Sequence, residues 1–102
     1  MAQFDLYQYR KPGSQVVFLV DAQSDLLQTL KTRVVIPLYP VRPETPLMRI
    51  LHPTVAWSGA TYFLSTSEMA AVRLSELKQV VGSLSSMRHE IIAAMELLFT
   101  GI

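Results

Sequence analysis

The sequence contains no cysteine, and charged residues are sparse. Without thiols the chain has no disulfide bond, no thiolate nucleophile and no thiolate-ligated metal site. Only 17% of the residues are Asp, Glu, Lys or Arg, and the formal net charge is +1. A protein that neutralises many phosphates normally carries a basic stripe, and the nine Lys and Arg residues form none beyond the pair Arg10-Lys11. Direct recognition of nucleic acid is therefore not expected.

Glycine-rich loops and long apolar runs are also missing. The four glycines are scattered at positions 13, 59, 82 and 101, so a glycine-rich phosphate loop is absent. No segment reaches the roughly 18 apolar residues of a membrane span, and the amino terminus lacks the layout of a signal peptide. With 102 residues, half of them hydrophobic, we expect a single folded domain over 1–102. Because a membrane span and a signal peptide are both missing, we expect it to be cytoplasmic and without a membrane partner.

Side chains for acid–base chemistry or metal binding are few. The two histidines are His52, which precedes Pro53 in an expected loop, and His89, on the polar side of an expected helix. No carboxylate lies at triad or metal-ligand spacing from either histidine. Glu90 and Glu96 are six positions apart, so they point to different faces of that helix. The residues predict no catalytic site, no metal and no cofactor.

Short stretches rich in β-branched and aromatic residues predict a mainly β-protein. The segment 3–9 alternates, with Phe4 and Leu6 on one face and Tyr7 and Tyr9 on the other. The tyrosines are expected to pack across strands rather than to bind a ligand. Further strands are predicted over 16–20, 33–38, 54–57 and 60–65, with Ser58-Gly59 as a two-residue hairpin turn between the last two.

Proline and polar residues separate these strands. Pro37 lacks an N–H donor, so it predicts an edge position or a bulge. Ser24 or Asp25 is a candidate cap for a short turn carrying Leu26 and Leu27. The prolines that follow, at 40, 43, 46 and 53, exclude a long helix and predict an extended excursion across the surface. Beyond them, a strand is predicted in the second half of 67–74 and a helical turn over 75–81. A lone strand tryptophan such as Trp57 is more often a core residue than a stacking platform for a base.

The stretch 84–102 has the periodicity of one amphipathic helix. Gly101 lies where a helix would stop. Serines 83, 85 and 86 are candidate N-caps. The core-facing stripe is Leu84, Met87, Ile91, Ala94, Met95 and Leu98. Short strands followed by one helix predict a mostly antiparallel α+β protein.

The same stretch has more apolar residues than its core stripe requires. Ile92, Leu97, Phe99 and Ile102 lie outside the stripe, near a terminus that usually frays into solvent. An apolar surplus at such a place predicts burial against a second protein chain. The sequence thus favours an interaction protein over an enzyme.

Several short segments occur in a characteristic order along the chain. They are Val20-Asp21-Ala22-Gln23-Ser24-Asp25, Val35-Ile36-Pro37-Leu38, Leu51-His52-Pro53-Thr54-Val55, Thr66-Ser67-Glu68-Met69-Ala70 and the closing Phe99-Thr100-Gly101-Ile102. Taken together, they resemble the CcdB family over nearly the whole chain. The members of this family are toxins of plasmid-borne type II toxin–antitoxin pairs, which serve plasmid maintenance.

The resemblance implies a fold and a set of partners. The fold is an SH3-like antiparallel barrel of the CcdB/MazF type with a C-terminal helix, assembled as a homodimer whose C-terminal tails lie near the twofold axis. The implied activity is binding to the A subunit of DNA gyrase, a topoisomerase, whose cleaved-DNA complex is trapped; no catalysis is implied. A disordered segment of a CcdA-type antitoxin is implied to fold onto the dimer and to release gyrase.

The resemblance also implies which residues bind gyrase. The sequence departs from the family at Thr100, where the family has a tryptophan that stacks on gyrase, and at Glu96, where it has an uncharged amide. These departures predict weaker gyrase poisoning. The implied gyrase-binding residues are Leu26, Leu27, Glu96, Phe99, Thr100, Gly101 and Ile102.

Two alternatives remain open. One is a non-toxic or retargeted homologue that retains antitoxin binding. The other is a MazF-like endoribonuclease on the same scaffold, which needs an arginine and an acid–base partner close together. Its candidates are Arg33, Arg73, His52 and His89, and nothing in their spacing joins them.

Overall fold

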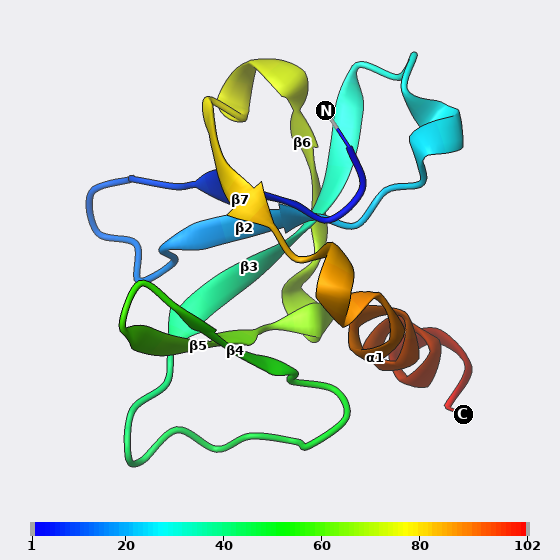
Figure 1. The fold of residues 1–102 in the computed structure, drawn as a ribbon. Helices are drawn as coiled ribbons and strands as arrows, with labels where there is room; N and C mark the ends of the chain where they lie inside the picture. Colours follow the sequence, from blue (N-terminus) through cyan, green and yellow to red (C-terminus); the bar gives the residue numbers. More distant parts are fainter. Residues whose placement is uncertain (1, 102) are drawn as a thin grey trace.

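The chain folds into a curled antiparallel sheet with a helix at its C-terminal end, as Figure 1 shows for a computed structural model that describes residues 2–101. This architecture confirms the predicted fold class, a mostly-β barrel-like sheet with one C-terminal helix. The strands are β1 (Asp5–Gln8), β2 (Phe18–Asp21), β3 (Thr32–Pro40), β4 (Thr54–Trp57), β5 (Ala60–Leu64), β6 (Ala70–Arg73) and β7 (Gln79–Ser83). The 3-10 helices are η1 (Asp25–Leu27), η2 (Thr66–Glu68), η3 (Leu74–Glu76) and η4 (Ser85–Met87), and the α-helix is α1 (Arg88–Thr100).

The longest strand, β3, holds the sheet together. Six of the seven strands run in the order β4-β5-β3-β2-β1-β7, and the seventh, β6, pairs with β3. The first half of β3 pairs with β6, the second half with β5, and the opposite edge with β2. One strand therefore belongs to two half-sheets, which curl around a common core.

Pro37 lies inside this central strand, so the predicted edge position is wrong. It pairs with Leu19 of β2. On the other side it lies between Val35, which pairs with β6, and Leu38, which pairs with β5. Its carbonyl accepts a hydrogen bond from the Ser65 N–H at 2.9 Å. On this side β3 pairs with β6 up to Val35 and with β5 from Leu38. The missing N–H donor of Pro37 is tolerated because it falls between these two ladders and interrupts neither.

The hairpin between β4 and β5 is as predicted. Ser58 and Gly59 form the turn with φ values of +50° and +83°. Two consecutive positive φ angles are typical of a type I′ turn, whose twist matches that of the flanking strands. The pairing of Trp57 with Ala60 follows directly from this turn.

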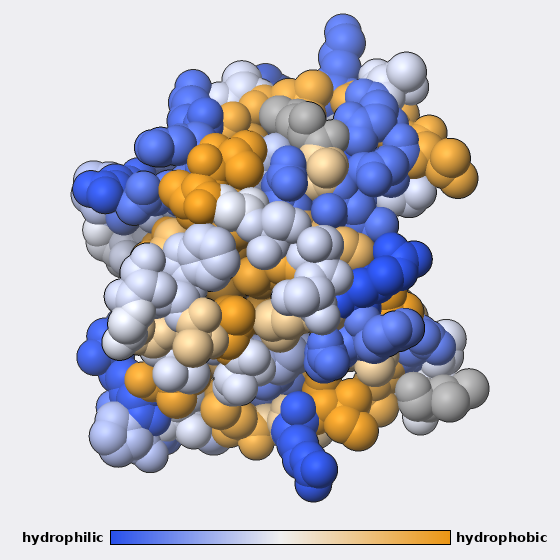
Figure 2. Space-filling model, viewed as in Figure 1, coloured by the Kyte–Doolittle hydropathy of each residue, from blue (hydrophilic) through white to orange (hydrophobic). Residues whose placement is uncertain are grey.

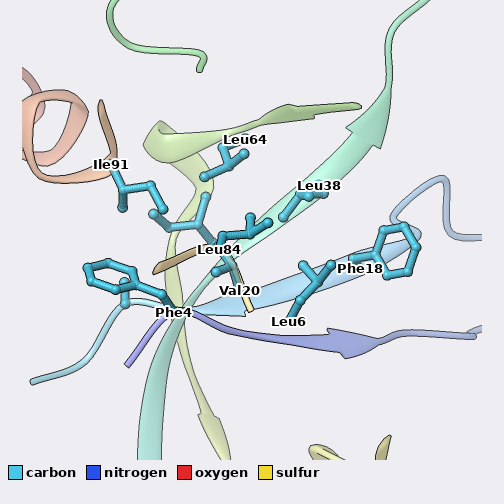
Figure 3. Close-up of a cluster of buried hydrophobic side chains, with 10 residues drawn as sticks. Phe4, Leu6, Phe18, Val20, Leu38, Leu64, Leu84 and Ile91 are labelled. Carbon is cyan, nitrogen blue, oxygen red and sulfur yellow. The ribbon is translucent and has the colours of Figure 1, made fainter. Parts of the chain in front are cut away.

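The main core lies between the concave face of the sheet and α1. Figure 3 shows Ile91 of α1 pointing toward Leu64, Leu84 and Phe4, with Val20, Leu6 and Leu38 behind them. Ile91 and Ala94 are completely buried, which confirms the predicted inner face of the helix. The ten buried members of this cluster are Phe4, Leu6, Phe18, Val20, Ala22, Ile36, Leu38, Leu64, Leu84 and Ile91.

Strand β1 is buried on both faces. Leu6 belongs to the main core, whereas Tyr7 belongs to a second cluster on the opposite face with Leu19, Val35 and Leu77. The predicted alternation of 3–9 is confirmed, and the tyrosines pack against neighbouring strands as expected. The second face matters below because it holds the Tyr7 side chain.

Two regions near the C-terminus differ from their prediction. The residues 79–81, at the end of the predicted helical turn over 75–81, belong instead to strand β7, in which Val80 and Gly82 pair with Tyr7 and Leu6 of β1. Pairing with a distant strand supplies backbone partners that local sequence cannot reveal. The helical turn itself is confirmed only over η3.

The terminal helix begins later than predicted, and no serine caps it. The N-cap of α1 is Met87, whose side chain makes no capping bond. The Ser83 hydroxyl instead accepts from the Ser85 N–H at 3.1 Å. Leu84 is buried, and its N–H donates to the Phe4 carbonyl at 2.8 Å. Because this bond ties the backbone to the N-terminal segment, the α-helix starts only after one 3-10 turn.

Trp57 closes the barrel between its two edge strands. It is half-buried against the main core, as predicted for a lone strand tryptophan. Its six-membered ring lies directly on Gly82, where an added Cβ would collide with the ring carbons. Strands β4 and β7 are the two ends of the sheet order, so this contact joins the edges without hydrogen bonds.

We therefore expect Gly82→Ala to lower the free energy of unfolding by about 1–3 kcal/mol, the usual cost of forcing extra volume into a packed contact. Urea denaturation monitored by far-ultraviolet circular dichroism measures the effect, also in variants that lack the single tryptophan. In the Trp57→Leu background the same substitution is expected to cost much less, because the ring is gone. An unchanged denaturation midpoint for Gly82→Ala alone would show that the ring is free to move away.

Candidate protein-interaction surface

The first candidate element is η1, which holds Leu26 out into solvent. Leu26 is 92% exposed and Leu27 is 46% exposed, values that are unusual for leucine in a folded protein. The Ser24 hydroxyl caps the turn by accepting from the Leu26 N–H at 3.1 Å. This confirms the predicted capped turn. The exposure of Leu26 is therefore a property of an ordered turn.

A buried amide holds the loop that contains η1. Gln23 is 7% exposed, and its side-chain nitrogen donates to the carbonyls of Leu27 at 3.3 Å and Thr32 at 3.2 Å. Its side-chain oxygen accepts from the Val34 N–H at 2.9 Å. One side chain thus joins the start, the middle and the end of the loop.

A buried ion pair lies directly beneath this amide. Arg33 Nε donates to an Asp21 carboxylate oxygen at 2.8 Å, and the two side chains are 1% and 0% exposed. Arg33 also donates to the Gln23 carbonyl at 3.2 Å, and the other Asp21 oxygen accepts from the Gln23 N–H at 2.9 Å. This cluster positions η1 and was not predicted from the sequence. One sequence signal for the ion pair was available. Asp21 ends β2, and Arg33 lies at the start of β3, the strand that pairs with β2.

The second candidate element is the end of α1. Phe99 is 69% exposed, and Thr100 and Glu96 are exposed beside it. The Thr100 hydroxyl donates to the Glu96 carbonyl at 2.7 Å, so its polar group is already satisfied within the helix. Gly101, at φ +75°, ends the helix and donates its N–H to the Leu97 carbonyl at 3.0 Å. The predicted glycine stop is confirmed.

Apolar surface continues from α1 onto the loop between β3 and β4. Met48 and Ile50 are 60% and 57% exposed, and they line a hollow together with Leu97 of α1. Figure 2 shows the corresponding apolar area at the lower right, over the bend of this loop beside the helix. The proline-rich excursion is extended, as predicted. Of the expected apolar surplus, Ile92 packs against the main core, whereas Phe99 remains uncovered.

Within one chain, the two elements do not meet. In Figure 1 the 3-10 turn after β2 is at the upper right, and the end of α1 is at the lower right. Among residues 2–101, no hydrogen bond or apolar cluster joins Leu26 or Leu27 to the residues 96–101. The sequence-predicted set is therefore divided into two exposed patches, and Ile102 lies outside the described residues.

The candidates for acid–base chemistry are scattered. Arg33 is buried in its ion pair, and Arg73 is exposed on β6. The Nδ1 of His52 accepts from the Met48 N–H at 2.9 Å, and its ring packs edge-on against Phe63. His89 lies on the exposed side of α1. Over residues 2–101, no cluster of three or more His, Cys, Asp or Glu side chains could hold a metal ion, and no helix is long and apolar enough to span a membrane.

Tyr7 carries a buried hydroxyl for which the described part of the chain offers no hydrogen-bond partner. Burial raises the pKa of this phenol above its ordinary value of 10.0, and the negative charges of Asp5 and Asp21 raise it further. Because the unfolded chain ionises first, the stability that Tyr7 contributes is complete below pH 10 and falls as the pH rises above that value.

We expect Tyr7→Phe to remove part of this alkaline loss of stability. At neutral pH the variant should be as stable as the parent, or more stable by up to about 1 kcal/mol, because an unpaired buried hydroxyl is lost. Urea denaturation at pH 7.5 and at about pH 11 measures both effects. If the parent and Tyr7→Phe lose the same free energy of unfolding between these two pH values, the alkaline loss of stability does not come from Tyr7.

Comparison with known proteins agrees with this architecture. A family model described as "CcdB protein" matches residues 3–101. An endoribonuclease in complex with its cognate antitoxin, from mycobacterial species, has a similar structure with a TM-score of 0.77. The similarity covers 96% of this chain and 93% of that chain, at 11% sequence identity. At this identity, the likeness establishes the fold alone.

Proposed function

Since the chain belongs to the CcdB family, we propose that it is a toxin that binds the A subunit of DNA gyrase and traps the cleaved-DNA complex. The observation that carries the proposal is the exposure of Leu26 and Phe99 on ordered elements, at 92% and 69%. Both positions correspond to gyrase-facing residues of the family. Large apolar side chains held out in this way are typical of anchors for a partner protein.

We further propose that the active form is a homodimer. One chain presents Leu26 and Phe99 on separate patches, and a twofold pairing through the C-terminal ends would combine four such anchors in one assembly. The exposed apolar side chains of Met48 and Ile50, next to Leu97, support burial by a second copy. Sedimentation of the purified protein tests this: a monomer at micromolar concentration would contradict it.

The proposed mechanism is binding without chemistry. Full burial of a leucine or phenylalanine side chain contributes roughly 1.5–3 kcal/mol. Two copies each of Leu26 and Phe99 would then supply roughly 6–12 kcal/mol, which is similar to the entropic cost of association, estimated at about 4–15 kcal/mol. Net affinity for gyrase therefore depends on the remaining contacts, above all on position 100.

Two features of the helix end favour weak binding to gyrase. Thr100 replaces an aromatic anchor, and its hydroxyl is occupied by the Glu96 carbonyl. Glu96 adds an exposed negative charge that an apolar interface would have to desolvate. These residues favour one form of the proposal, in which the protein binds its antitoxin but poisons gyrase only weakly.

An antitoxin is the second proposed partner. Family membership supports it, and the structurally similar endoribonuclease is described in complex with its cognate antitoxin. In the family, the antitoxin segment folds as it binds, so its apolar residues need an ordered surface to bury against.

Inducible expression in a bacterium tests the toxin activity. We expect filamentation or death together with accumulation of cleaved DNA, and a purified supercoiling assay should show inhibition at high protein concentration. Normal growth at high expression and full supercoiling activity would contradict gyrase poisoning. Leu26→Ser, which leaves the core untouched, is the matched variant and should abolish both effects.

The similarity in fold to an endoribonuclease favours one alternative, cleavage of RNA. The geometry offers it little support, because Arg33 is buried and paired and the histidines lie on different elements. Incubation of the purified protein with single-stranded RNA distinguishes the two. If the protein cleaves the RNA and Arg73→Ala removes the cleavage, the ribonuclease is favoured. If the RNA stays intact, binding to gyrase without chemistry is favoured.

A further inference from the structure

The first residues of the chain lie between the two exposed patches. We call the residues 2–5 the N-terminal bridge. In Figure 1 this dark-blue segment curves past the loop that follows β2 and passes close to the orange start of α1. That loop carries Leu26 on η1, and α1 carries Phe99 near its end. The bridge is thus the part of the chain that relates the positions of the two patches.

One set of contacts joins the bridge to η1. The Gln3 N–H donates to Asp25 Oδ1 at 2.7 Å, and the Gln3 side-chain nitrogen donates to the Ala22 carbonyl at 3.2 Å. Asp25 is the first residue of η1, and Leu26 follows it directly. Gln3 therefore holds the start of the turn, whereas the buried Gln23 amide holds its last residue.

A second set of contacts joins the bridge to α1. Gln3 Oε1 accepts from Arg88 Nη1 at 3.3 Å. Arg88 is the first residue of α1, and its guanidinium carbon lies 5.7 Å from the centre of the Phe4 ring, within the range of a cation–π contact. The Phe4 carbonyl accepts from the Leu84 N–H, which lies just before the helix. The bridge therefore reaches the start of the helix through a side-chain amide, a ring and a backbone carbonyl.

An amide is the group that this arrangement requires at position 3. The Gln3 nitrogen donates to the loop, and the Gln3 oxygen accepts from the helix. A carboxylate offers acceptors only and an ammonium group offers donors only, whereas an amide offers both. One glutamine therefore joins two segments that are 19 and 85 positions away along the chain.

Phe4 fixes the course of the bridge. Its φ is +71°, a conformation that bulky residues rarely adopt. The side chain is 3% exposed in the main core, and the Phe4 N–H donates to the Asp21 carbonyl at 2.6 Å. A conformation of this kind persists only where the surrounding contacts determine it, and such positions cluster at functional sites. The bridge is therefore a fixed connection between the end of β2 and the start of α1.

The helix carries this connection to its exposed end. Buried side chains on its inner face hold α1 against the core. Arg88 and Phe99 belong to the same 13-residue helix, whose backbone keeps the two ends in a fixed relation. On the loop side, Asp25 is adjacent to Leu26. Contacts through Gln3 therefore relate the positions of two exposed side chains that do not meet each other.

We propose that Gln3 is a positioning residue, whose amide holds Leu26 and helix α1 in one arrangement in the free protein. The use of this arrangement in binding the gyrase A subunit rests on the proposed function. Ordering a loop on binding costs affinity, so anchors that are already in place bind more tightly. Gln3 thereby contributes to affinity without contacting the partner.

Amide hydrogen exchange, measured by NMR on the free protein, tests the coupling. Arg88→Met removes the helix-side contacts and changes an exposed residue. We expect the Leu27 N–H, on the loop side, to exchange about threefold or more faster in this variant. Asp25→Ala removes the loop-side acceptor, and the Leu84 N–H should respond by a similar factor. An effect that crosses the bridge in both directions is not expected from contacts that stabilise one element alone.

Matched controls carry the same substitutions elsewhere. Gln3→Met removes both contacts of the side-chain amide, and Gln79→Met changes an exposed glutamine on β7. Arg42→Met changes an exposed arginine on the loop between β3 and β4. Neither control should alter exchange at the Leu27 N–H. Because Arg88 acts on the loop through Gln3, the double variant should exchange no faster there than Gln3→Met alone.

Calorimetric titration with the purified gyrase A subunit tests the consequence for binding. Gln3→Met should bind about threefold to tenfold more weakly than the parent, because η1 must then be ordered on binding. Gln79→Met should bind as tightly as the parent. Urea denaturation of both variants shows that each is folded at the temperature of the titration, so that weaker binding does not reflect unfolding.

Two results of the exchange measurement would overturn the proposal. One is unchanged exchange at the Leu27 N–H in both Arg88→Met and Gln3→Met. The other is equal acceleration at the Ile36 N–H, because Ile36 pairs with Val20 in the centre of the sheet and reports opening of the whole fold.

The titration separates this proposal from the gyrase proposal. Coupled exchange in a protein that does not bind the gyrase A subunit would support the coupling through Gln3 and refute the gyrase proposal. Binding that is equally tight in Gln3→Met and the parent would overturn the positioning role of Gln3 and leave the gyrase proposal standing.

Discussion

Replacement of Thr100 by tryptophan is expected to tighten binding to the gyrase A subunit by about thirtyfold. A central aromatic anchor typically contributes on the order of 2 kcal/mol or more, which corresponds to that factor. In a twofold assembly the side chain occurs twice, so the combined effect is larger where the two contributions add.

The helix end can accept this change. Thr100 is the last residue of α1, it is exposed, and its hydroxyl contacts only the Glu96 carbonyl among the described residues. Gly101 completes the helix through a bond to Leu97 that does not involve the side chain at 100. A tryptophan therefore adds an anchor beside Phe99 without displacing a buried group.

Thr100→Val is the matched control, because it removes the hydroxyl and adds no aromatic ring. Titration calorimetry against the purified gyrase A subunit, with a supercoiling assay in parallel, measures both variants. We expect tighter binding and stronger inhibition for Thr100→Trp and little change for Thr100→Val. If tryptophan leaves binding unchanged, the interaction with gyrase does not use this end of the helix.

Arg33→Met is expected to lower the free energy of unfolding by about 3–5 kcal/mol. The substitution leaves the Asp21 carboxylate charged and without its ion-pair partner at 0% exposure, and breaking a buried pair from one side typically costs this much. Small proteins are stable by only about 5–15 kcal/mol, so a large part of the stability depends on this pair.

The matched control is the double variant Asp21→Leu with Arg33→Met. Replacing both partners by apolar groups of similar volume is often neutral, because no buried charge remains. We expect the double variant to be more stable than Arg33→Met alone in urea denaturation. A cost below about 1 kcal/mol for the single variant would show that water reaches the carboxylate.

The ion pair of Asp21 and Arg33 also affects the binding of a partner protein. Arg33 holds the Gln23 carbonyl, and the Gln23 amide holds the loop that carries Leu26. Variants at Asp21 or Arg33 should therefore loosen η1 and weaken partner binding, although neither side chain is accessible. Their effect would be indirect, through the position of Leu26.

Local patterns were sufficient to predict much of the fold. Two positive φ angles at Ser58-Gly59, the Ser24 cap and the Gly101 stop all follow from the chemistry of neighbouring residues. The inner face of α1 follows from its 3.6-residue period, since Ile91 and Ala94 are the positions that such a helix must bury. Each of these features is decided within a few residues.

Features that depend on distant residues were not predicted. Pro37 suggested an edge, yet β3 is central because it exchanges partners at this residue. The predicted helical turn over 75–81 includes residues 79–81, and pairing with β1 makes these residues part of a strand. The start of α1 is delayed because Leu84 is bonded to Phe4, eighty positions away in the sequence.

Residue patterns alone predict a mostly-β chain with a C-terminal helix and an apolar helix end, and short segments in order along the chain carry its resemblance to the CcdB family. Three features became visible only in the folded chain: the buried cluster of Asp21, Gln23 and Arg33, the contact of Trp57 with Gly82, and the separation of Leu26 from Phe99. Hydrophobic period, capping and turn conformation are local properties of the chain, so neighbouring residues are enough to predict them. Strand partners and buried polar contacts depend on which distant segments pack together.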